Sequence, residues 1–161
     1  MRQSNLLLTG YKSINEKDLS PSKIVLNKMN SNLNKFLFTN DFNVIEEEVK
    51  EILKSNYEYI IMLGWKPNIK KLSIELVSYR DNNCLYTNII LGEILKLLKK
   101  YNIAYTLSEN PGTSYCNYAY YEVLNYIKEE NIKTKVIFIH IPAIEKFSDI
   151  DKFISMFNNI K

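Results

Sequence analysis

Short apolar runs recur along the chain, separated by stretches in which apolar side chains return every three or four residues. The runs predict strands, because a strand that is buried on both faces of a sheet is apolar without interruption. Residues 59–64, Tyr-Ile-Ile-Met-Leu-Gly, predict a central strand that ends in a glycine. Further strands are predicted at residues 6–8, 35–39, 104–107 and 135–141.

Residues 72–79 carry a different pattern, in which apolar side chains alternate with side chains that are mostly polar. Such alternation predicts a strand with two unlike faces, with Leu72 and Ile74 on one of them. Ser73 and Glu75 then lie on the other face, and Glu75 is in the middle of the predicted strand.

The periodic stretches predict helices that connect these strands. Serine or aspartate stands at three of the predicted starts, Ser20, Asp41 and Ser148, as is typical of helix caps. The three consecutive glutamates at residues 46–48 are interpreted as a solvated face of the second helix. The helices are predicted to start near residue 20 and to cover residues 41–53, 87–100, 115–130 and 148–157.

Strands that alternate with helices predict an α/β fold, a three-layer α/β/α sandwich around a mostly parallel mixed sheet. We expect one domain over residues 1–161. In such sheets the functional crevice lies beyond the carboxyl ends of the strands. Gly10, Gly64 and His140 are predicted to end strands, and the loop before Cys116 follows another, so we expect these residues to meet at one edge.

Composition and charge narrow the classes of function. The 161 residues are 46% hydrophobic and 24% charged, as in ordinary globular proteins. The net charge of +3 comes from lysines scattered among glutamates, which argues against a nucleic-acid partner. No apolar run approaches the roughly 20 residues that span a bilayer, and the amino-terminal run is too short for a secretory signal. We therefore expect a cytoplasmic protein with no membrane partner.

The two cysteines, Cys84 and Cys116, and the single histidine are too far apart in sequence for the clustered spacing of a zinc site. We expect no metal, and in a reducing compartment we expect both cysteines to be thiols. No glycine-rich phosphate loop follows any predicted strand, which makes a nucleotide-binding α/β domain a weak alternative.

The stretch with the clearest chemistry is residues 110–117, Asn-Pro-Gly-Thr-Ser-Tyr-Cys-Asn. It places Cys116 in the first turn of a predicted helix, where the helix dipole and unpaired amides favour a thiolate. The glycine turn at Gly112 lets a carbonyl oxygen approach backbone amides, as an oxyanion hole requires. His140 is a candidate base and Glu75 a candidate group to orient it, so the sequence predicts a cysteine-nucleophile hydrolase.

Each of these residues also has a structural interpretation. A buried cysteine is often a small core residue, a histidine at a strand end is often only hydrogen-bonded, and Glu75 could face solvent on an edge strand. Their joint occurrence favours the catalytic interpretation. Trp65, directly after Gly64, is predicted at the rim of the crevice.

These motifs resemble the pyroglutamyl peptidase I family, the pyrrolidone-carboxylate cysteine peptidases, over nearly the whole chain. Residues 112–117 resemble the family's nucleophile motif, Ala-Gly-Thr-x-x-Cys-Asn, and residues 138–142 resemble its histidine motif, Phe-Ile-His-x-Pro. Residues 6–11 resemble the opening strand and its Thr-Gly-Phe turn. Residues 62–75 resemble the segment that ends in the family's catalytic glutamate.

The resemblance implies a catalytic triad of Cys116, His140 and Glu75 that removes an amino-terminal pyroglutamyl group from a peptide substrate through an acyl-enzyme, without metal or cofactor. In it Cys116 attacks, His140 shuttles the proton and Glu75 orients His140, while the backbone amide of Cys116 helps to bind the oxyanion. The resemblance further implies a cytoplasmic homo-oligomer.

The chain departs from the family around the substrate. Of the family's aromatic and glycine-rich loop after the first strand only Tyr11 keeps an aromatic ring, and Ser114 and Tyr115 replace an aromatic-aliphatic pair. With Trp65, these three residues are expected to bind the substrate. Two family arginines near the site align with residues 69 and 76, Ile and Leu, and the segment between the glutamate and the cysteine is shorter. Two alternatives therefore stay open: a related acyl substrate, or a catalytically silent relative that binds a peptide or small molecule in the same crevice.

Overall fold

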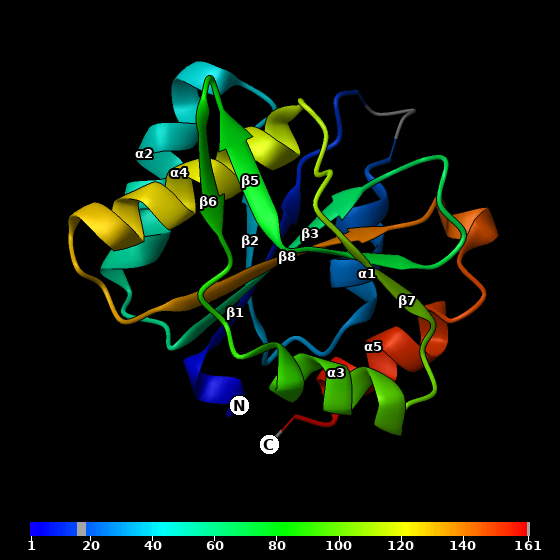
Figure 1. Cartoon of the computed structure of the whole chain (residues 1–161). Coiled ribbons are helices and arrows are strands. Elements are labelled where there is room, and N and C mark those ends of the chain that lie inside the picture. Colours follow the sequence, from blue (N-terminus) through cyan, green and yellow to red (C-terminus); the bar gives the residue numbers. More distant parts are fainter. Residues whose placement is uncertain (16–18, 161) are drawn as a thin grey trace.

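A six-stranded sheet forms the centre of the molecule (Figure 1). The computed structural model describes residues 1–15 and 19–160. The strands of this sheet are β1 (Leu6–Tyr11), β2 (Asn34–Phe38), β3 (Tyr59–Trp65), β4 (Leu72–Glu75), β7 (Tyr105–Ser108) and β8 (Lys135–Ile141). Their order is β2-β1-β3-β8-β4-β7. The first four in this order are parallel, β4 is antiparallel to β8, and β7 is parallel to β4, so the sheet is mixed.

Helices cover both faces of the sheet, and the expected three-layer sandwich is confirmed (Figure 1). One face carries α1 (Pro21–Lys28), α3 (Leu91–Lys100) and α5 (Ile150–Asn158), and the other carries α2 (Phe42–Lys54) and α4 (Tyr115–Glu129). Along β3, Ile61 and Leu63 pack in the first of these interfaces, and Ile60 and Met62 pack in the second. A strand that is apolar at every position is thereby buried on both sides.

The alternating segment at residues 72–79 is not one strand, and that prediction is wrong. β4 ends at Glu75, and Val77 begins β5 (Val77–Arg80), which pairs with β6 (Asn83–Tyr86) in a separate two-stranded sheet. Leu76 lies at the switch: its amide donates to Ser108, at 2.8 Å, and its carbonyl accepts from Thr87, at 2.9 Å. Alternation records which face a side chain is on, but not which neighbour the backbone bonds to.

Two helix starts also differ from the prediction. The third helix begins at Leu91 rather than at residue 87, because Thr87 and Asn88 use their side chains to bind carbonyls of residues 136 and 134, at 2.6 and 2.8 Å. The last helix is preceded by Asp149 rather than capped by Ser148. Asp41 caps α2 as expected, through the amide of residue 43, whereas the Ser20 hydroxyl contacts Ser22 and does not cap α1.

The interpretation of residues 46–48 as a solvated face is wrong for Glu48, which is only 8% exposed. Its carboxylate accepts hydrogen bonds from the Thr39 amide, at 2.9 and 3.1 Å, and from the Thr39 hydroxyl, at 2.6 Å. Three consecutive helix residues span about 200° of the circumference, so they do not share a face. Glu48 therefore ties the end of β2 to α2.

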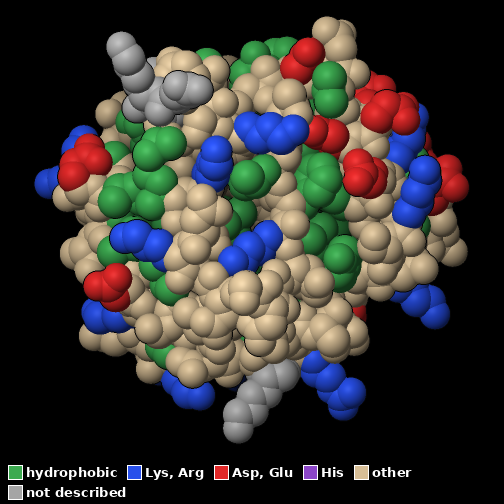
Figure 2. Space-filling model, turned by 180° about the vertical axis from the view of Figure 1, so that it is seen from behind, with side chains coloured by type: hydrophobic (Ala, Val, Ile, Leu, Met, Phe, Trp, Pro, Cys, Tyr) green, Lys and Arg blue, Asp and Glu red, His purple; other side chains and the backbone are tan. Residues whose placement is uncertain are grey.

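The surface carries scattered charge. Lysine and arginine side chains are spread over the face opposite to that of Figure 1, between acidic and neutral residues (Figure 2). Within residues 1–15 and 19–160, no helix has the length and apolar character needed to cross a bilayer.

Candidate active site

Three parallel strands end together at the edge of the sheet where the crevice was expected. Gly64 on β3 lies directly opposite His140 on β8, and Gly10 follows the pair formed by Thr9 and Met62 on β1 and β3. The convergence of Gly10, Gly64 and His140 is therefore confirmed.

The strand before Cys116 does not end at this edge, contrary to the prediction. β7 runs with β4 and against β8, and its last residue, Ser108, pairs with Glu75. Residues 109–114 then carry the chain from Ser108 to the start of α4 at Tyr115.

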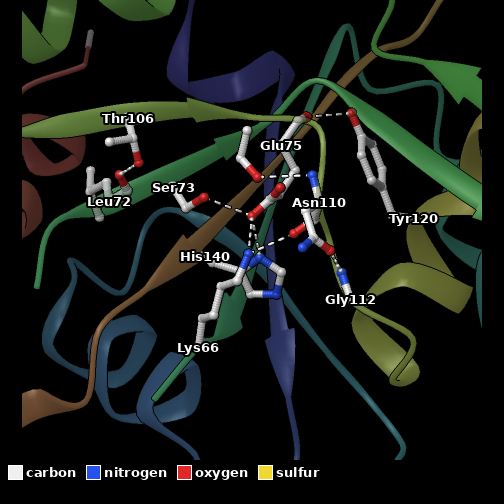
Figure 3. Close-up of polar contacts among 10 residues, drawn as sticks. Lys66, Leu72, Ser73, Glu75, Thr106, Asn110, Gly112, Tyr120 and His140 are labelled. Atoms are coloured by element: carbon white, nitrogen blue, oxygen red, sulfur yellow. Dashed lines mark hydrogen bonds and ion pairs between the residues drawn. The ribbon is translucent and has the colours of Figure 1, made fainter. Parts of the chain in front are cut away.

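Glu75 and His140 form a buried pair on one face of the sheet (Figure 3). Ser73 lies opposite His140 and Glu75 opposite Phe138, so Glu75 reaches the imidazole diagonally across two antiparallel strands. Glu75 Oε1 is 2.8 Å from His140 Nδ1, and the two residues are 0% and 2% exposed. A carboxylate accepts the Nδ1 proton, which leaves the lone pair of the neutral ring on Nε2.

The surroundings of Glu75 keep it ionised. Besides His140, Oε1 accepts a hydrogen bond from the Ser73 hydroxyl at 2.8 Å and lies 3.3 Å from Lys66 Nζ. Burial acts to raise the pKa of Glu75, but hydrogen bonds from His140, Ser108 and Ser73 outweigh burial and lower that pKa below its usual value. A carboxylate in this state can orient an imidazole and stabilise its protonated form.

Cys116 stands in the first turn of α4 with its sulfur against β3. A Cβ atom on Gly64 would lie 2.7 Å from Cys116 Sγ and 2.6 Å from Phe138 Cζ, so only glycine leaves room for the sulfur. The Phe138 ring in turn lies 4.8 Å from the His140 ring, centroid to centroid. The Cys116 sulfur thus lies over Gly64, and His140 is the residue that pairs with Gly64 on β8.

The sequence predicted a thiolate at Cys116, but the structure favours the protonated thiol. Burial raises the pKa of Cys116 to about 11, and hydrogen bonds from Ser114, the Trp65 backbone and Tyr11 offset only part of that rise. The expectation that the helix start favours a thiolate is therefore wrong for the free protein, in which the thiol predominates. In the described part of the chain, no hydrogen bond joins Sγ to the His140 ring.

Asn117, the residue after Cys116, fixes the first turn of α4 to the β5–β6 hairpin. Its side-chain Oδ1 accepts from the Ser78 hydroxyl, at 2.7 Å, and from the Tyr79 amide, at 2.9 Å, while its Nδ2 donates to the Tyr79 carbonyl at 2.7 Å. Tyr120, one turn further on, donates from its hydroxyl to the Glu75 carbonyl at 3.1 Å. These contacts set the position of the helix that carries Cys116.

The residues expected to bind the substrate lie in different environments. Tyr11 is 5% exposed and its hydroxyl contacts the Tyr115 carbonyl at 3.4 Å, while Trp65 is 49% exposed at the end of β3. Ser114 immediately precedes α4. The Tyr115 ring packs on Phe42, with centroids 4.3 Å apart, so its backbone rather than its ring meets Tyr11.

The sequence reasoning missed Lys66, Ser73 and Asn117. Two of them left a signal: Ser73 shares a strand face with Glu75 in the alternating segment, and Asn117 ends the nucleophile motif at residues 112–117. Cys84 is an exposed thiol on β6, and Cys116 is also free. Within the described ranges, no three histidine, cysteine or acidic side chains are grouped to hold a metal ion.

Comparison with known proteins yields one family. The family model described as pyroglutamyl peptidase matches residues 78–156. A pyrrolidone-carboxylate peptidase from Brachyspira hyodysenteriae is 23% identical over 86% of the chain and 83% of its own length. Pyrrolidone-carboxylate peptidase 1 from Caldanaerobacter subterraneus is 24% identical over 86% of the chain and 82% of its own length.

Solved structures share the fold. The structure of pyroglutamyl peptidase I from Bacillus amyloliquefaciens superposes with a TM-score of 0.81 at 18% identity, covering 96% of this chain and 94% of that one. The pyrrolidone carboxyl peptidase from Thermococcus litoralis gives a TM-score of 0.78 at 17% identity, covering 95% and 89%. The family model, the sequence relatives and these structures all indicate the pyroglutamyl peptidase I family, which this chain resembles in sequence and in fold.

Proposed function

We propose that the chain is a cysteine peptidase that removes an amino-terminal pyroglutamyl group, or a closely related acyl group, from peptides. The observation that carries the proposal is the buried pair of Glu75 and His140, 2.8 Å apart, beside the helix start that presents Cys116. A base oriented by a carboxylate next to a thiol is the arrangement that acyl transfer requires.

In the proposed reaction His140 Nε2 takes the proton of the Cys116 thiol as the sulfur attacks the acyl carbonyl carbon. The carbonyl π electrons move to the oxygen, where the Cys116 backbone amide donates a hydrogen bond. Collapse of this intermediate breaks the carbon–nitrogen bond, and His140 returns the proton to the leaving amine. Water then attacks the thioester and gives a proton to His140, and the departing sulfur regains that proton as the free acid leaves.

The raised pKa of the Cys116 thiol limits when its proton can move in this reaction. With the pKa of Cys116 raised to about 11, the thiol does not ionise in advance, so the proton has to move as the substrate binds or reacts. Rotation of the Cys116 side chain toward the Nε2 lone pair would supply the missing sulfur–imidazole contact. We expect the bound substrate to hold the sulfur in that position.

A second candidate is a catalytically silent relative that binds a pyroglutamyl peptide in the same crevice. This candidate is favoured by burial of Cys116, which raises the pKa of its thiol, and by the lack of a hydrogen bond between Cys116 and His140 in the described residues. Such a protein would bind the ligand with no turnover.

Release of a chromophore from a pyroglutamyl amide distinguishes the two candidates. We expect hydrolysis by the wild-type chain, its loss in Cys116→Ala, and no change in Cys84→Ala, since Cys84 is exposed on β6. Equal hydrolysis by the wild type and Cys116→Ala would remove Cys116 from the mechanism. Calorimetric binding of a pyroglutamyl peptide without hydrolysis would favour the silent relative.

A further inference from the structure

Lys66 joins two parts of the site that come from distant segments of the chain (Figure 3). It follows β3 directly, and its amide donates to the Ile141 carbonyl at 3.0 Å, which extends the pairing of β3 with β8 by one step. From this fixed backbone its Nζ lies 3.3 Å from Glu75 Oε1 and 2.6 Å from the Asn110 carbonyl oxygen. The side chain is 29% exposed, so the ammonium group is partly shielded from water.

The contact with Glu75 supplies a charge that the other partners lack. Glu75 is 0% exposed, and Ser73 and a neutral His140 offer it only uncharged hydrogen-bond donors. A buried carboxylate is costly unless a positive charge compensates it. Within the described residues, Lys66 is the only lysine or arginine at ion-pair distance from Glu75. Lys66 therefore favours the ionised carboxylate while the imidazole is still neutral.

The contact with Asn110 reaches the segment that leads to Cys116. The Asn110 amide donates to the Ser108 hydroxyl at 3.0 Å, and its side-chain oxygen accepts from the Gly112 amide at 3.4 Å. Gly112 has φ +82°, in the left-handed region that favours glycine, so this turn has a specific shape. The Asn110 carbonyl points out of this turn to Lys66, which links the turn to the end of β3.

We propose that Lys66 is a positioning residue that couples the carboxylate–imidazole pair to the segment before the nucleophile. It acts through Glu75, whose charge holds His140 in the tautomer with the lone pair on Nε2, and through Asn110, which holds the turn ahead of Cys116. This inference rests on the proposed function for its kinetic consequence, but its effect on the imidazole does not depend on turnover.

The kinetic test compares Lys66→Met, which keeps the length and removes the charge, with Lys66→Arg, which restores the charge. Lys71→Met, at an exposed position in the same connection, is the matched control. We expect kcat to fall about 30-fold in Lys66→Met, KM to change less than about threefold, and Lys66→Arg to recover most of the activity. The acid limb of kcat/KM against pH should move to higher pH in Lys66→Met, because Glu75 is then protonated more readily.

The second test needs no substrate. His140 is the only histidine of the chain, so the ¹⁵N resonances of its ring require no assignment among several residues. We expect one tautomer, protonated on Nδ1, in the wild type and in Lys71→Met, and a mixture of tautomers in Lys66→Met.

The two tests separate two kinds of failure. If the wild type hydrolyses no pyroglutamyl substrate and Lys66→Met still changes the tautomer, the proposed function fails and the role of Lys66 stands. If the wild type is active, and Lys66→Met matches Lys71→Met in rate, pH profile and tautomer, the role of Lys66 is overturned.

Discussion

Replacing Gly64 with alanine tests whether contact with β3 sets the position of the sulfur. The added Cβ would lie 2.6 Å from Phe138 Cζ and 2.7 Å from Cys116 Sγ. Non-bonded carbon atoms have their optimal separation at about 3.5 to 4.0 Å, so both neighbours would have to retreat by about 1 Å. Phe138 is 1% exposed and packs against Tyr120 and His140, and it has little room to move. We therefore expect the sulfur to be displaced and the core to be strained.

The expected size of both effects follows from this geometry. Overpacking of a filled core costs about 1 to 3 kcal/mol of the free energy of unfolding. For a chain of this length, a loss of about 2 kcal/mol lowers the thermal midpoint by about 4 to 8 °C. A displacement of the nucleophile by about 1 Å can lower kcat/KM by about 100-fold.

Urea unfolding and hydrolysis of a pyroglutamyl amide measure the two effects in one set of samples. Gly92→Ala is the control, because a Cβ on Gly92 has nothing within 4 Å and the residue lies in α3. We expect Gly92→Ala to be neutral or to stabilise the protein by up to about 1 kcal/mol, through helix propensity, with unchanged activity. Wild-type stability and wild-type kcat/KM in Gly64→Ala would refute the reasoning.

Two further predictions concern protonation. Since burial raises the pKa of Cys116 to about 11, its alkylation rate with iodoacetamide should rise about tenfold per unit from about pH 7 to about pH 10. Mass spectrometry of the labelled peptides separates it from Cys84, and a plateau at Cys116 below about pH 8 would contradict the assignment. Glu75 has a pKa in the folded state that is lower than its unfolded value of about 4.5, so its ionisation stabilises the fold above that pH, and this contribution is lost as the pH falls through the folded pKa. Urea titrations give the free energy of unfolding at about pH 6 and at about pH 3. Between these pH values we expect Glu75→Gln to lose less of this free energy than the wild type. An identical loss in both proteins would show that Glu75 does not contribute.

The sequence predicted the elements correctly where burial determines the pattern of apolar residues. β3 and β8 are apolar at nearly every position because both faces of the central strands are covered, and α4 begins and ends within a residue of its prediction. The separation of β4 from β5 at Leu76 left no such trace, since the side chains keep alternating through the switch. β6 was missed because it is short and its side chains are largely exposed, so it has no apolar pattern.

At the site, the types of the residues predicted which side chains are candidates for catalysis, but the sequence did not predict how deeply each of them is buried. Cys116, His140 and Glu75 were chosen for chemistry that each side chain carries by itself, and the pairing of Glu75 with His140 is observed. The protonation of Cys116 depends on how deeply α4 is packed against β3, which the local sequence does not encode. Lys66 acts through partners 9 and 44 residues away, so no local motif could have identified it.

The antiparallel pairing of β4 with β8 has a consequence for how such a site tolerates change. The ladder register brings Glu75 and His140 together, since Ser73 and Glu75 lie opposite His140 and Phe138. A slip of one residue would turn Glu75 to the opposite layer and separate it from His140. Connections that do not contact this pair can therefore change in length and composition, while the pairing of Glu75 with His140 is inherited intact with the sheet.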